Sequence, residues 1–190
     1  MITHNIYKKA HPHLFDRLIG ELEDSLHENI SWLNNIYGRC ERLVKVVDGR
    51  NFYSANWYKK GNDYVLLAPD EGLGNFAFFT LSEPTDLETY YQGDNTYCRT
   101  PFSLIVWVDV RTINEDRDTE AIKEEILKVL NGSTHSRTGR FFINRIWERA
   151  ENVFRDFDYE EIDNQFLMHP FAGFRFEGEL EIQTDCVLLS

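Results

Sequence analysis

The chain of 190 residues has few cysteines and no long hydrophobic run, and each absence argues against a class of protein. Cys40, Cys98 and Cys186 lie far apart and form no CxxC pair, which argues against a disulfide framework or a cysteine-based zinc site. Free thiols in a reducing compartment are expected instead. No apolar run approaches the ~20 residues of a membrane helix. The first residues, MITHNIYKK, lack the apolar core of a signal peptide. We therefore expect a cytoplasmic protein.

Basic residues are also scarce, because 20 Lys and Arg face 32 Asp and Glu and give a formal net charge of -12. Such a surface disfavours general adhesion to nucleic acid or to an anionic membrane. The charge is uneven: residues 156–190 are strongly acidic and hold Arg175 as their only Arg or Lys, whereas residues 131–149 are mainly basic. An apolar fraction of 42% argues against disorder and predicts a single domain over residues 1–190.

The first half of the chain predicts one helix followed by strands. Apolar side chains recur every three or four positions over residues 12–36, which indicates a long helix that ends at Gly38. Strands are expected at 42–47 and 51–59 on either side of Asp48-Gly49, a strong hairpin signal. Two more strands are expected at 64–68 and 76–81, and an irregular loop over about 82–100.

The second half alternates between strands and helices. Residues 102–110 predict a central strand covered on both faces. A helix capped by Asp118 is expected over 119–130, and a second helix over 140–154. A last strand is expected from Phe174. These elements predict an α+β fold with a mainly antiparallel sheet, a long N-terminal helix, and a helix pair from the C-terminal half packed on one face.

The last strand places Glu177, Glu179 and Glu181 on one face, opposite Phe174 and other apolar residues. A solvated acidic face is the simplest interpretation. Glu177 and Glu179 would lie roughly 6–7 Å apart, which approaches the carboxylate spacing of an inverting glycosidase. Nothing in the pattern separates the pKa values of these two groups, as an acid and base pair requires.

An arginine group lies between the two expected helices and within the second of them. It consists of Arg137, Arg140, Arg145 and Arg149, of which the last two are four residues apart. Two interpretations are open: a solvated face paired with nearby acids, or a contact with an acidic partner surface. The acidic C-terminal region of a second copy would supply such a surface in a head-to-tail contact.

Other motifs carry little chemistry. His11-Pro12-His13 lacks a third ligand, residues 114–120 lack the glycine and final glutamate of a calcium loop, and Gly72-Leu73-Gly74 precedes a strand and not a helix. No nucleophile, cofactor motif or metal cluster is visible. The sequence therefore predicts no catalytic residues, no cofactor and no metal.

The order of elements is similar to that of the tail-terminator and tail-completion (neck) proteins of tailed bacteriophages and prophages. The resemblance is carried by the first helix, the strand meander, PFSLIVWVDVR, DTEAIKEEILKVLNG and AGFRFEGELEI. It implies a non-enzymatic structural protein that forms a ring at a tail or neck end, contacts other tail proteins and becomes a virion component. In such a ring, Glu177, Glu179 and Glu181 would form an acidic channel face along which DNA slides without adhering.

Two other functions stay open at this point. One is a small cytosolic enzyme that uses paired carboxylates on a neutral substrate such as a glycan. The other is an acidic binding module for a basic partner.

Overall fold

The computed structural model describes residues 4–60, 63–70, 72–89, 96–113, 118–132, 136, 138–158 and 164–183. Within them the fold is α+β, as predicted, with a seven-stranded sheet and a separate three-stranded sheet. The large sheet has the order β1-β2-β6-β8-β10-β9, and β7 pairs with β8 beside this path. Pairing is parallel for β1 with β2 and β2 with β6, and antiparallel elsewhere in this sheet. Its strands are β1 (Asn5–Tyr7), β2 (Asn35–Arg39), β6 (Phe76–Leu81), β7 (Asp86–Thr89), β8 (Thr96–Asp109), β9 (Gly139–Trp147) and β10 (Phe171–Gln183).

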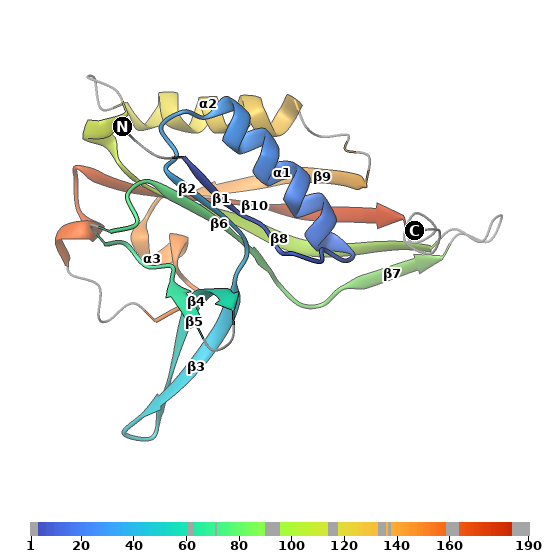
Figure 1. Cartoon of the computed structure of the whole chain (residues 1–190), viewed down its shortest axis with the longest axis horizontal. Helices are drawn as coiled ribbons and strands as arrows, with labels where there is room; N and C mark the ends of the chain where they lie inside the picture. Colours follow the sequence, from blue (N-terminus) through green and yellow to red (C-terminus); the bar gives the residue numbers. More distant parts are fainter. Residues whose placement is uncertain are drawn as a thin grey trace.

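The helices lie on both sides of this sheet. Helices α1 (Phe15–Asn29) and α2 (Thr119–Gly132) cover one face, whereas α3 (Ala150–Val153) and the small sheet lie on the other side (Figure 1). Short 3-10 helices, η1 (Val110–Thr112) and η2 (Asn164–Leu167), follow β8 and precede β10. Asp118 accepts a hydrogen bond from the main-chain N–H of Glu120 at 2.8 Å, which confirms its predicted role at the start of α2.

Strand β8 is central and buried on both faces, as its sequence predicts. It pairs with β6 on one side and with β10 on the other. The core under α1 and α2 includes Leu18, Leu22, Val106, Val108, Ile126 and Phe176. A second core on the opposite face gathers Tyr37, Trp57, Phe76, Phe78, Ile105, Trp107, Val153 and Phe154. Both predicted thiols that fall in described residues, Cys40 and Cys98, are free and buried, whereas Cys186 lies outside those residues.

The predicted helix over 140–154 is wrong. Residues 139–147 form the edge strand β9, and only Ala150–Val153 are helical, on the side of the sheet opposite to α1 and α2. The helix prediction rests on Ile143, Trp147, Ala150 and Phe154, which recur at helical spacing but belong to two elements: the first two lie on β9, and the others lie on or directly after α3. Within β9, a bulge in the pairing with β10 places Ile143 and Ile146 against the same core. A side chain on Gly178 would overlap the Phe142 carbonyl oxygen, so the bulge requires glycine there.

Two other boundaries also differ from the prediction. The first helix ends at Asn29 and not near residue 36, and residues 35–39 form β2. Leu33 and Ile36 reach the same core as α1, so the apolar stripe continues although the backbone changes. The expected irregular loop over 82–100 contains β7 and the beginning of β8, which pair from Asp86–Arg99 to Thr89–Thr96. Residues 90–95 lie outside the described part of the chain.

The small sheet consists of β3 (Glu41–Val47), β4 (Arg50–Lys60) and β5 (Asp63–Leu66), in that order. The β3–β4 hairpin projects from the body and is here called the arm (Figure 1). Its turn is the predicted Asp48-Gly49, and both residues have positive φ angles, 50° and 77°. These angles suit the tight turn that joins two twisted strands.

Candidate functional site

The predicted acidic face of β10 is largely neutralised by arginines. The Glu177 carboxylate accepts hydrogen bonds from Arg175 Nε at 2.9 Å and from Trp147 Nε1 at 2.7 Å, and it pairs with Arg155. These contacts occupy a carboxylate that a glycosidase would need for acid or base work. The geometry therefore gives the paired-carboxylate enzyme no support.

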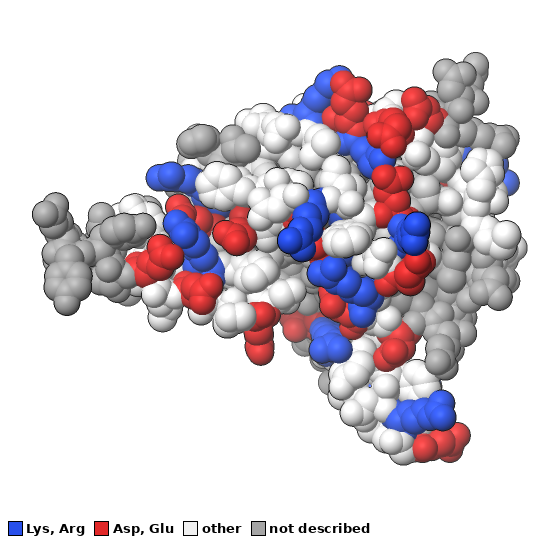
Figure 2. All heavy atoms as spheres, turned by 180° about the vertical axis from the view of Figure 1, so that it is seen from behind, with Lys and Arg blue, Asp and Glu red and all other residues white. Residues whose placement is uncertain are grey.

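Glu181 is neutralised in a similar way, at the other end of the same strand face. It is buried and lies 2.7 Å from Arg99 and 3.8 Å from Arg140. Only Glu179, between the two, is exposed. The expectation of a uniformly solvated acidic face is therefore wrong for Glu177 and Glu181. Seen from behind, the molecule shows basic and acidic side chains intermixed (Figure 2). A channel-lining role for the three glutamates stays a prediction.

The predicted arginine group does not form one helix face. Arg140 and Arg145 lie on β9, where they are opposite Glu181 and Glu177 in the β10 register. Arg149 precedes α3, and its carbonyl accepts the first hydrogen bonds of that helix. Arg137 lies outside the described residues. The predicted head-to-tail contact of this group is not tested by this arrangement.

Arg175 is the anchor that joins α3 to the sheet. Its side chain is 1% exposed and pairs with Asp156, and its Nη1 donates to the Val153 carbonyl at 3.3 Å. A further hydrogen bond runs from Nε to Ser103 Oγ at 3.1 Å. The alternating sequence predicts that Arg175 faces away from the core under the helices. It does not predict that Arg175 is buried, because the residues that cover it come from a separate segment.

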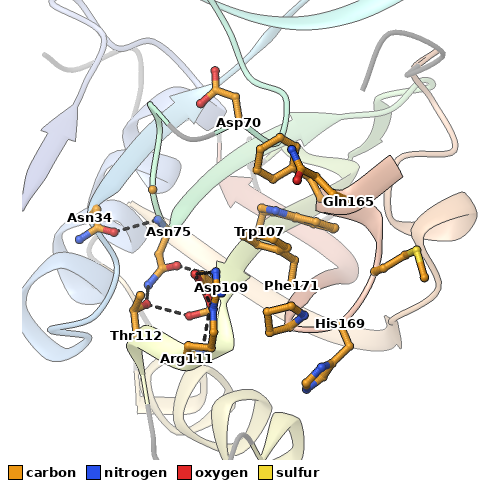
Figure 3. A pocket seen from close by; sticks show the side chains of 14 residues that line it. Asn34, Asp70, Asn75, Trp107, Asp109, Arg111, Thr112, Gln165, His169 and Phe171 are labelled. Atoms are coloured by element: carbon orange, nitrogen blue, oxygen red, sulfur yellow. Dashed lines mark hydrogen bonds and ion pairs between the residues drawn. The ribbon is translucent and has the colours of Figure 1, made fainter. Parts of the chain in front are cut away.

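A pocket of about 660 Å³ lies where β6 begins and β8 ends (Figure 3). One side is built on Asn75, whose amide donates to the Trp32 carbonyl and to Thr112 Oγ1 and accepts from the Asp109 N–H. The Asn75 main-chain N–H donates to Asn34 Oδ1 at 2.8 Å. These polar groups bond to one another, so they stabilise the loops around the pocket.

The other side of the pocket is mainly apolar. It is formed by Trp107, Phe166, Met168, Pro170 and Phe171. The guanidinium of Arg111 lies 5.5 Å from the centre of the Phe171 ring and also pairs with Asp109 at 2.7 Å. The pocket has the size and mixed lining of a small-molecule site. Among the described residues that line it, no nucleophilic side chain lies beside a base.

The arm exposes apolar side chains on both of its faces. Val44 and Val46, which share one face, are 56% and 66% exposed. Val47, near the turn, is exposed on the opposite face. The sequence of the arm contains five basic residues, Arg42, Lys45, Arg50, Lys59 and Lys60, against Glu41 and Asp48. The arm is therefore an apolar and slightly basic projection on an acidic protein.

Glu23 is a buried carboxylate on α1, beside Gly38 of β2. Burial raises its pKa to about 8, although Lys8 opposes the rise. A raised pKa means that the folded chain holds this proton more tightly than the unfolded chain does. The contribution of Glu23 to the free energy of unfolding is therefore fully present below about pH 4.5 and is lost as pH rises through about 8.

We expect Glu23→Gln to remove this pH dependence. At pH 9 the variant should melt several degrees above the wild type, whereas the two should differ little at pH 4. Calorimetry across this pH range measures the effect. Glu28→Gln, an exposed site on the same helix, is the control and should melt like the wild type at both pH values. Equal melting temperatures for Glu23→Gln and the wild type at pH 9 would contradict a raised pKa at the buried Glu23 carboxyl group.

The described residues form neither a metal-binding cluster nor a membrane-spanning helix. No group of three or more His, Cys, Asp or Glu side chains among them is placed to hold a metal ion. Within the same part of the chain, no helix has the length and apolar character to cross a membrane.

Comparison with known proteins adds no assignment. No family model matches this sequence, and no curated protein matches it.

Proposed function

We propose that this chain is a non-enzymatic structural protein that acts by self-assembly, of the tail-terminator or head-tail completion type of tailed phages and prophages. The observation that supports self-assembly is the arm, which projects from the body (Figure 1) and exposes Val44 and Val46. Exposed apolar strands of this kind are usually covered by a partner, because they otherwise promote aggregation.

The specific assignment to phage tails is supported by the order of elements. A first helix, a strand meander, the central strand β8, helix α2 and the late strand β10 follow one another as the resemblance requires. Such a protein assembles as a homo-oligomeric ring and binds other tail or neck proteins. It is made in the cytoplasm, where buried free thiols such as Cys40 and Cys98 stay reduced.

Replacing the two most exposed valines of the arm with Asp, in a Val44→Asp, Val46→Asp variant, is expected to abolish assembly. The change puts charge on the surface that the partner must cover, while the two cores stay intact. Sedimentation velocity over a wide concentration range should show oligomers for the wild type and monomers for the variant. Electron microscopy of the wild type should show closed rings.

The matched control is Leu87→Asp, which alters an equally exposed apolar residue (69%) on β7, outside the arm. It should assemble like the wild type. A wild type that stays monomeric at every concentration would contradict self-assembly, and open filaments would contradict the ring.

A further inference from the structure

The outer edge of β3 is open for pairing. β3 pairs with β4 on one side, and within the described chain no strand pairs on its other side. The main-chain N–H and C=O groups of Tyr53 on β4 bond to Asp158, with distances of 2.8 and 2.7 Å. These main-chain groups therefore point away from Val44, the β3 residue that pairs with Tyr53. By the alternation of antiparallel pairs, the N–H and C=O groups of Arg42, Val44 and Val46 then lie on the open edge.

The side chains of β3 are self-complementary. Glu41, Leu43 and Lys45 share one face, with opposite charges on either side of the leucine. When a second β3 runs antiparallel with Leu43 at the centre, Glu41 faces Lys45 of the partner subunit, and the same pair recurs by symmetry. The open-edge N–H and C=O groups of Arg42 and Val44 also face each other in this register.

A groove of about 500 Å³ lies where β3 leaves the body. Its lining includes Arg39, Cys40, Leu81 and Phe157. It also includes Thr80, which is 6% exposed and whose hydroxyl has no hydrogen-bond partner among the described residues. Cys40 already donates its N–H to the Phe79 carbonyl of β6 at 2.8 Å, so pairing with a second β3 ends before Cys40, and the turn of the second copy meets this groove at the end of β6. The exposed valines near the turn would thus be covered by this groove.

From these three observations we infer that two copies of the chain pair through their β3 edges. The two arms run antiparallel as one continuous sheet, and each turn sits in the groove at the base of the partner's arm. The contact is isologous, so each subunit gives and receives the same surface. This inference deepens the proposed function by naming one self-assembly contact, and it rests on that proposal for self-association.

The test is a charge exchange across the pair, measured by sedimentation equilibrium. Glu41→Lys and Lys45→Glu each place like charges opposite one another and should weaken dimerisation at least about ten-fold. The double variant Glu41→Lys, Lys45→Glu restores opposite charges and should restore dimerisation. Both side chains are exposed, and Glu41→Lys gives up only a surface ion pair with Lys9 at 3.1 Å, so all three variants should fold like the wild type. If the single variants weakened dimerisation through charges outside this pair, the double variant would not restore it.

A cross-link tests the position of the turn. Asp48→Cys and Ser82→Cys variants, both on a Cys186→Ser background, should form a disulfide-linked heterodimer only when mixed and oxidised. Burial raises the pKa of Cys40 to about 12, so this native thiol does not compete. As a control, a Leu87→Cys variant mixed with the Asp48→Cys variant and oxidised should give no disulfide-linked heterodimer.

The outcomes separate this inference from the proposed function. If the wild type assembles, but the charge reversals do not weaken dimerisation and the disulfide-linked heterodimer does not form, the β3 contact is wrong and self-assembly stands. If single reversals weaken dimerisation and the double variant does not recover, the antiparallel register is wrong. If the wild type is monomeric throughout, both proposals fall.

Discussion

Replacing Val106 with Asp is expected to unfold the chain. Val106 is 1% exposed in the middle of β8, where Ala77 of β6 and Phe174 of β10 lie beside it. An aspartate there would bury a charge without a partner, which costs about 3–5 kcal/mol of the free energy of unfolding. Urea denaturation followed by circular dichroism should show a loss of that size or no folded protein.

The same substitution at an exposed valine is the control. Val44→Asp changes a residue that is 56% exposed on the arm, so its free energy of unfolding should stay within about 0.5 kcal/mol of the wild type. This measurement also shows that the arm variants used for assembly are folded. Equal denaturation midpoints for Val106→Asp and the wild type would show that β8 is not central.

Arg175→Met is expected to destabilise the protein by about 2–3 kcal/mol, because it leaves a buried network without its cation. Asp156 and the Val153 carbonyl would lose the donors that hold α3 against the sheet. Asp156 is partly exposed and can be hydrated, so the cost should lie below that of a fully buried pair. Thermal denaturation and hydrogen exchange of residues 150–157 measure the two effects.

Arg155→Met is the matched control for this network. Arg155 also pairs with Glu177 but is exposed to solvent, so its loss should cost less than about 1 kcal/mol. Protection of residues 150–157 should fall only in the Arg175 variant. A similar loss of hydrogen-exchange protection in both variants would show that α3 is held by the ion pairs with Glu177 and not by the buried Arg175 side chain.

Much of the fold follows from local sequence. The local sequence predicts β8, β10, α2 and the hairpin at Asp48-Gly49, because each has a strong hydrophobic period or turn signal within a few residues. The sequence predicts a helix in place of β9, because apolar residues of β9 and α3 together follow a helical spacing, whereas the strand depends on its pairing with the distant β10. It predicts one helix in place of α1 and β2, because both contribute apolar side chains to one core. In these two cases partner strands override the local pattern.

Some features of the candidate site also follow from local sequence, whereas others depend on tertiary packing. The sequence by itself determined the net charge of -12, the tight turn of the arm and the valines near it, because composition and turn chemistry are local. Only the tertiary structure decided that Glu177 and Glu181 meet arginines and that β3 keeps an open edge beside a groove. Ion pairs and strand edges depend on which distant segments pack together, and a one-dimensional pattern of charges does not contain that information.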